Sequence, residues 1–285
     1  MWWGELVPDQ EAADRTCLVY DSAPLEEDVE ILGFPRAALR ASADAPLAHW
    51  FVRLSDVAPD GAVTLVTGAG LNGAHRRSAA DPEPLHPGAT EDLTVEMHFT
   101  SWVFPRGHRI RLAVSNGQWP MIWPTPFAMT TSLSVGEGGS RLSLPVVPFE
   151  ERPRPSFLPA APPAEPPGWA SGGEMLPGRL VVEREGEVAR ARWSGAGWSE
   201  APWGRSEYDE RLWWEVAEDR PGSASAGGSS ATTVTLPDRT IAWRGTLEVR
   251  NDGDTFHYSY RRQLEVDGAL IRERRWKESV PRDHQ

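Results

Sequence analysis

The sequence predicts an all-β chain in which a β-sandwich or barrel is followed by a second antiparallel sheet. Three observations predict this. Short apolar runs alternate with turn residues over the first half of the chain, and that half has no long stretch with helical spacing. The last quarter contains longer runs with two-residue periodicity. With 285 residues, of which 40% are hydrophobic and 25% charged, the chain is long enough for more than one core.

The first region extends to about Pro148 and consists of short predicted strands. Turn sequences separate them, among them Pro59-Asp60-Gly61 and Pro87-Gly88. Residues 109–114 alternate charged and apolar side chains, as one half-buried strand does. The predicted strands are Thr16–Tyr20, Glu30–Gly33, Ala37–Ala43, Ala48–Val57, Val63–Gly70, Thr94–Phe99, Arg109–Ser115, Met129–Val135 and Ser140–Pro145.

Residues 149–177 form a predicted linker, because prolines recur there and proline cannot occupy the interior of a sheet. We expect an extended, polyproline-like strap. Residues 178–285 predict an antiparallel β-meander with turns at Glu185-Gly186, Asn251–Asp254 and Asp267-Gly268. The predicted segments are strands at Arg179–Val182, Glu187–Trp193 and Arg211–Ala217, a flexible loop at Pro221–Ala231, and three long strands over 241–249, 256–266 and 269–276.

Charge and composition exclude several classes of function. The net charge of −12 argues against nucleic acid and against anionic membrane surfaces as partners. Cys17 is the only cysteine, so no intrachain disulfide can form. The N-terminus lacks the features of a signal peptide and no apolar run reaches ~20 residues, so we expect a cytoplasmic protein. Neither a metal-binding motif nor a dinucleotide or phosphate loop occurs, and we expect no metal and no cofactor.

Several segments, in order along the chain, carry a family resemblance. They include Ser22–Asp28, Asp56–Gly61, Pro82–Gly88, Phe104–Leu112 and the Trp119-Pro120 to Pro126 stretch. Together they resemble the C-terminal domain of the X-Pro dipeptidyl-peptidase and CocE/NonD serine hydrolase family. The resemblance implies that residues 13–148 are a jelly-roll sandwich of the galactose-binding-like type.

The same resemblance implies a catalytic domain that this sequence does not contain. In the family an α/β-hydrolase domain with a Ser–Asp–His triad precedes the jelly roll, and here no G-x-S-x-G nucleophile elbow occurs. Residues 1–12 then correspond to a remnant of the inter-domain linker. We therefore predict no catalytic residues in this chain and no hydrolysis by the chain alone. Its expected partner is an α/β-hydrolase catalytic domain, missing or separately encoded.

Two places are candidates for lining a substrate pocket or a domain interface. Asn72, His75 and Arg76 follow a predicted strand end, where family members place residues near the domain interface. Trp119 and Trp123 lie in a proline-rich loop, where exposed rings stack sugars or cover the sandwich. Two functions follow as hypotheses: the non-catalytic part of a peptidase or esterase, or a stand-alone module that binds carbohydrate or protein. An uncovered interface would also make the chain self-associate.

Overall fold

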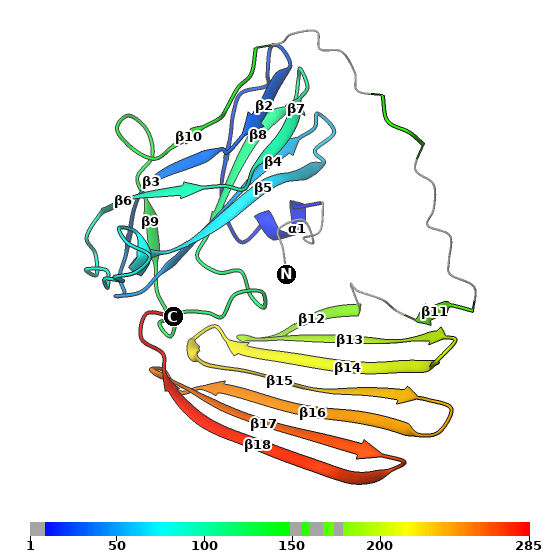
Figure 1. Ribbon diagram of the computed structural model, residues 1–285. Coiled ribbons are helices and arrows are strands. Elements are labelled where there is room, and N and C mark those ends of the chain that lie inside the picture. Colours follow the sequence, from blue (N-terminus) through cyan, green and yellow to red (C-terminus); the bar gives the residue numbers. More distant parts are fainter. Residues whose placement is uncertain (1–8, 149–155, 160–167, 174–178) are drawn as a thin grey trace. The chain divides into compact units, whose positions relative to one another are not determined.

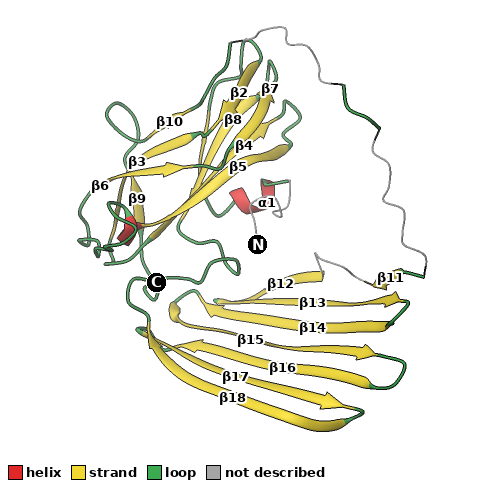
Figure 2. Ribbon diagram, viewed as in Figure 1, coloured by secondary structure: helices red, strands yellow, loops and turns green. Residues whose placement is uncertain are grey.

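The computed structural model describes residues 9–148, 156–159, 168–173 and 179–285 (Figure 1). The chain divides into two units, one formed by Met1–Arg154 with His284–Gln285 and the other by Pro155–Asp283. Nearly all regular structure in the described residues is β-strand (Figure 2). This confirms the predicted fold class, an all-β chain with a sandwich followed by a second antiparallel sheet.

The first unit contains three antiparallel sheets. One has the order β1-β8-β4-β5, the second has the order β10-β3-β6 with β9 also paired to β3, and β2 and β7 form a two-stranded ribbon. The elements are α1 (Glu11–Asp14), β1 (Leu18–Asp21), β2 (Val29–Gly33), β3 (Arg36–Ala43), β4 (His49–Val57), β5 (Val63–Asn72), η2 (Gly73–His75), β6 (Glu91–Glu96), β7 (Thr100–Phe104), β8 (Arg109–Ser115), β9 (Thr131–Leu133) and β10 (Arg141–Ser143).

Side chains from the two larger sheets build one apolar core in this unit. Strand β3 buries every second residue, as in Ala37 and Leu39, because successive side chains of a strand point to opposite faces. Strand β4 lies between β8 and β5 and is buried over almost its whole length, including Trp50. The alternation of apolar residues in the sequence thus places the core correctly for these strands.

The short helix α1 is fastened to the first sheet by an ion-pair network. Asp14 is buried, and its carboxylate accepts hydrogen bonds from Arg53 of β4 at 2.8 Å and Arg111 of β8 at 3.1 Å. The Gln10 side chain accepts a further bond from Arg53, and the Gln10 amide donates to the Val63 carbonyl at 2.9 Å. The N-terminal segment is therefore held to three neighbouring strands.

The second unit contains a single sheet of eight strands in the order β11-β13-β14-β15-β16-β17-β18, with β12 also paired to β13. All pairs are antiparallel. The strands are β11 (Ala170–Gly173), β12 (Arg179–Glu185), β13 (Val188–Ala201), β14 (Gly204–Ala217), β15 (Arg220–Thr235), β16 (Thr240–Asn251), β17 (Thr255–Val266) and β18 (Ala269–Pro281).

Strand register gives this sheet two chemically different faces. One, here called the aromatic face, carries half-buried rings and aliphatic side chains: Trp193, Tyr208, Leu212, Trp214, Trp243, Leu247, Tyr258, Tyr260, Leu264 and Trp276. The other, here called the ion-paired face, carries ion pairs such as the directly opposed Arg190–Glu215 at 2.7 Å and the diagonal Arg261–Glu273 at 2.6 Å. The apolar core cluster of the described residues lies entirely in the first unit.

Three sequence predictions about the strands were wrong. The predicted loop at Pro221–Ala231 is the greater part of strand β15, which extends to Thr235. The predicted strand Thr94–Phe99 ends at Glu96 as β6, and a separate strand, β7, follows it. The predicted linker over 149–177 contains strand β11, which pairs with β13. Most of that linker lies outside the described residues.

Candidate functional site

All five residues predicted to line a site lie at one end of the sheet with the order β1-β8-β4-β5. Phe51 of β4 pairs with Gly70 of β5 on one side and with Ser115 of β8 on the other. The loops that follow β5 and β8 therefore leave the sheet at the same end. Asn72, His75 and Arg76 belong to the first loop, and Trp119 and Trp123 to the second.

Asn72 ends strand β5 and starts the 3-10 helix η2. Its side-chain oxygen accepts a hydrogen bond from the Ala74 amide at 3.0 Å, as a capping residue does. Its side-chain nitrogen donates to the His284 carbonyl at 2.7 Å. His75 is half-buried at the end of η2. Both polar groups of the Asn72 side chain are thus occupied by backbone partners, which accounts for asparagine at this position without a ligand.

Arg76 fastens the loop that follows η2. Its side chain is only 3% exposed and lies 3.2 Å from a carboxylate oxygen of Glu91. Its guanidinium also donates to the carbonyls of Gly73 at 3.1 Å and Glu83 at 2.8 Å. These contacts assign Arg76 a structural role inside the domain. That Asn72, His75 and Arg76 line an interface stays a prediction.

In the loop of residues 116–130 the exposed apolar side chains are not the tryptophans that the sequence analysis singled out. Trp119 and Trp123 are half-buried, whereas Ile122 and Phe127 are each 39% exposed. The Trp119–Pro120 peptide bond is cis. A ligand or a neighbouring domain that approached this loop would meet Ile122 and Phe127 first. The sequence analysis missed these two residues because it selected tryptophans, and residue type does not reveal exposure.

A second apolar surface lies on the β2–β7 ribbon and was not predicted. We call it the Phe34–Phe99 patch, formed by Leu32, Phe34, Phe99 and Val103, which are 41%, 52%, 59% and 48% exposed. The rings of Phe34 and Phe99 meet edge to face with centroids 5.5 Å apart. Phenylalanines rarely stand in contact and exposed on a monomer unless something covers them. This patch is therefore the strongest candidate for an interface in the first unit.

Two arrangements in the described residues resemble parts of a catalytic triad: His108 with Asp56 in the first unit, and His257 with Asp252 and Ser279 in the second. His108 Nδ1 lies 2.8 Å from Asp56 Oδ1, and Trp102 Nε1 donates to Asp56 Oδ2 at 3.1 Å. A triad also needs a nucleophile that hydrogen bonds to the imidazole. Neither a serine nor a cysteine among the described residues makes that contact with His108, so the His108–Asp56 pair joins strand β4 to the turn before β8 and lacks the elements of a hydrolytic site.

The second arrangement contains a serine. His257 Nδ1 lies 2.9 Å from Ser279 Oγ, and His257 Nε2 lies 2.5 Å from Asp252 Oδ2. Ser279 lies within strand β18 and not on the strand–turn–helix elbow that exposes the nucleophile of an α/β-hydrolase. These contacts therefore join β17 to β18 and to the turn before β17.

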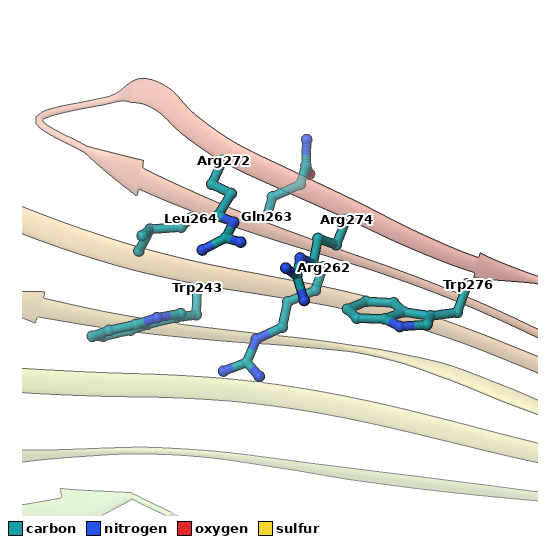
Figure 3. A pocket seen from close by; sticks show the side chains of 7 residues that line it. All are labelled: Trp243, Arg262, Gln263, Leu264, Arg272, Arg274 and Trp276. Atoms are coloured by element: carbon teal, nitrogen blue, oxygen red, sulfur yellow. The ribbon is translucent and has the colours of Figure 1, made fainter.

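Two pockets of the described residues have linings of contrasting chemistry. One, of about 410 Å3, opens between β1 and β8 on one side and β3 and β10 on the other, and its lining is mainly leucine, isoleucine and valine. The other, of about 260 Å3, lies on the aromatic face of the second unit. Figure 3 shows its lining residues, among which Trp243, Trp276 and three arginines stand out.

The described residues contain neither a candidate metal site nor a candidate membrane-spanning helix. No group of three histidine, cysteine or acidic side chains there is arranged to hold a metal ion. No helix in the described ranges is long and apolar enough to cross a bilayer.

Comparison with known proteins finds a family match in the first unit. Residues 5–138 match the family model of the X-Pro dipeptidyl-peptidase C-terminal non-catalytic domain. The described part of the matched region contains the elements from α1 through β9 and both loops discussed above. The match confirms the resemblance seen in the sequence motifs.

The relatives of this domain are longer hydrolases. A protein of Mycobacterium bovis, provisionally named a serine esterase, is 34% identical over 125 residues, which cover 38% of this chain and 20% of the relative. The cocaine esterase of a Rhodococcus species is 30% identical over 103 residues, covering 36% and 18%. A protein of Rhodopirellula baltica, provisionally named an Xaa-Pro dipeptidyl-peptidase, is 29% identical over 151 residues, covering 50% and 24%.

Among solved structures, an α-amino acid ester hydrolase aligns with a TM-score of 0.47 and 28% identity. The alignment covers 50% of this chain and 28% of that chain. The present chain spans about a fifth of the length of the three curated relatives named above.

Proposed function

We propose that this chain is the non-catalytic C-terminal part of an X-Pro dipeptidyl-peptidase-like or CocE/NonD-like serine hydrolase. On this proposal its sandwich packs on an α/β-hydrolase domain and helps to form the substrate pocket. The observation that carries the proposal is the family match over residues 5–138. The much greater length of the relatives, which carry esterase and peptidase names, supports the presence of a catalytic partner.

The Phe34–Phe99 patch is the surface we assign to that partner. Surfaces between domains of one chain commonly bury roughly 600–1,500 Å2 and contain apolar side chains at their centre. Phe34 and Phe99 supply two rings in contact, and Leu32 and Val103 extend the patch along the ribbon. Fully burying an exposed large apolar side chain contributes about 1.5–3 kcal/mol, and about half of that is available at side chains that are already about half-buried. The four side chains together therefore supply a usable driving force.

The first experiment measures catalysis by the chain alone. We expect no turnover of p-nitrophenyl acetate or Gly-Pro-p-nitroanilide, and no covalent labelling by a fluorophosphonate, because the sequence has no nucleophile elbow. Robust turnover together with a labelled serine in this chain would contradict the proposal.

The second experiment mixes the full chain with the α/β-hydrolase polypeptide encoded immediately upstream at its locus. We expect a one-to-one complex by size-exclusion chromatography with light scattering. The double variant Phe34→Ser, Phe99→Ser is expected to weaken this complex at least tenfold. The matched control is Val135→Ser, which removes a side chain that is 60% exposed elsewhere on the same unit. Equal binding by the double variant and the control would overturn the assignment.

The same double variant tests self-association. If the patch is uncovered in the isolated chain, the parent is expected to show a concentration-dependent rise in light-scattering mass that the double variant lacks.

The alternative function, a stand-alone binding module, predicts instead a glycan-array signal that Trp119→Ala or Trp123→Ala removes. The cytoplasmic location expected from the sequence stays a prediction.

A further inference from the structure

Three arginines share one region of the aromatic face. Arg262 lies on β17 and Arg274 on β18, and these two residues are direct cross-strand partners. Arg272 lies two residues before Arg274 and pairs with Leu264, so its side chain points to the same face. Like charges directly opposite each other in a sheet are destabilising. The sequence therefore keeps an unfavourable arrangement here that a neutral residue would relieve.

Carboxylates that would balance these charges are missing from the described residues around them. No ion pair to Arg262, Arg272 or Arg274 occurs within the described part of the chain. Neighbouring arginines behave differently: on the ion-paired face, Arg261 and Arg275 both bind Glu273. The contrast is sharp in a chain with a net charge of −12. An acidic protein with abundant carboxylates leaves three adjacent arginines without one.

The arginines line a pocket that two tryptophans also line. Trp243 of β16 and Trp276 of β18 contribute to the same space of about 260 Å3, and in Figure 3 the guanidinium groups of Arg262 and Arg274 lie between the two indole rings. The Trp276 ring is held in place by stacking on Tyr260 with centroids 5.3 Å apart. Gln263 also borders the pocket, but its side chain donates to Glu273 on the opposite face. The pocket wall is therefore aromatic and its charge is positive.

The Tyr260 ring lies over the neighbour of Arg262 on β16, which is glycine. Gly245 pairs with Arg262, and a methyl group there would lie 3.1 Å from both Ser230 Oγ and the Tyr260 hydroxyl. The absence of a side chain at Gly245 therefore leaves room for the Tyr260 ring, on which Trp276 stacks. Strand β18 is the last strand of the sheet, so the pocket is next to an edge through which a ligand can enter.

We propose that this pocket binds a phosphate monoester carried on a flat apolar body. The planar fork of arginine matches phosphate oxygens, and indole rings stack on planar groups. Three positive charges suit a phosphate dianion better than a carboxylate with a single charge. The volume suits a small ligand with one or two rings. This inference concerns the second unit alone and stands independently of the proposed hydrolase partner.

The test is isothermal titration of the full chain with 2-naphthyl phosphate, 2-naphthoate, neutral 2-naphthylmethanol and inorganic phosphate. We expect 2-naphthyl phosphate to bind at least tenfold more tightly than each of the others. Equal affinity for 2-naphthoate would overturn the assignment to a phosphate ester. Equal affinity for 2-naphthylmethanol would overturn the role of the arginines.

Adjacent residues on opposite faces provide a matched pair of variants. Arg274→Gln is expected to weaken 2-naphthyl phosphate binding at least tenfold, whereas Arg275→Gln changes the net charge equally and is expected to leave it unchanged. Arg274→Gln should not lower Tm, because it removes a repulsion, and this excludes misfolding as the cause of lost binding. An equal effect of both variants, or a light-scattering mass that falls only in Arg274→Gln and so reveals a second copy as the occupant, would overturn the proposal.

Discussion

Replacing Asp14 with asparagine is expected to lower the free energy of unfolding of the first unit by about 2–4 kcal/mol. The Asp14 side chain is 5% exposed and lies between Arg53 and Arg111, at 2.8 and 3.1 Å. The amide keeps a hydrogen-bond acceptor but loses the negative charge. Hydrogen bonding to Asp21 and then to Asp14 outweighs burial and raises the pKa of Arg111, so the positive charge remains after the substitution.

The size of the loss depends on the hydrogen bonds that Arg53 and Arg111 retain in the Asp14→Asn variant. Removing one partner from a buried ion pair commonly costs about 3–5 kcal/mol, because the other charge stays buried and uncompensated. Arg111 keeps two bonds to the Asp21 carboxylate, at 2.7 and 2.8 Å, and Arg53 keeps Gln10. Because these contacts remain, the expected loss is smaller, about 2–4 kcal/mol.

Differential scanning calorimetry with separate transitions for the two units measures the loss. The matched control is Glu11→Gln in the same helix, where the Glu11–Arg15 pair is 63% and 73% exposed and is expected to contribute less than about 1 kcal/mol. Hydrogen exchange of β1 amides should accelerate in the Asp14 variant alone. A loss below about 1 kcal/mol for Asp14→Asn would refute the view that this carboxylate fastens the N-terminal segment.

Two further predictions concern packing and pH. Gly73→Ala places a methyl group against the buried indole ring beneath it and is expected to destabilise the first unit by about 1–3 kcal/mol in urea denaturation, whereas Gly117→Ala, with open space around it, should have little effect. Hydrogen bonds from Arg261 and Arg275 lower the pKa of Glu273 below its ordinary value of 4.5, so its stabilising contribution is complete at neutral pH and is lost as pH falls through the lowered pKa. The Tm difference between parent and Glu273→Gln should therefore shrink from pH 5 to pH 3, and a constant difference would contradict this reasoning.

The alternation of apolar and polar residues, together with turn-forming residues, was sufficient to predict most strands. Strand β15 shows where these two signals fail. Its sequence is rich in glycine and serine, which ordinarily indicates a loop. In the sheet these small residues make room for large neighbours on the adjacent strand. A methyl group at Gly227 would collide with the Trp213 ring, and one at Gly228 with the Leu212 side chain. That requirement depends on cross-strand register, which a single sequence does not reveal.

The candidate sites were predicted unevenly for a related reason. The strand pattern correctly predicted that Asn72 and Arg76 follow a strand end, and that they line a site stays a prediction. The partners that occupy Arg76 come from residues up to 15 positions away. The Phe34–Phe99 patch and the arginine pocket depend on which side chains meet across strands. Arg262 and Arg274 are separated by a turn in the sequence and face each other only once β17 and β18 are paired.

The ion-paired face has a consequence for how the second sheet finds its alignment. A slip of one strand by two residues keeps the aromatic residues on their own face, so burial alone does not exclude it. The same slip would place Arg190 opposite Trp213 or Ala217 instead of Glu215 and would separate the pair found at 2.7 Å. Charge pairing along strands of 12 to 16 residues thus selects one alignment among several that hydrophobicity leaves nearly equivalent. The charged residues of the ion-paired face therefore specify the strand register, whereas the proposed phosphate-ester pocket lies on the aromatic face.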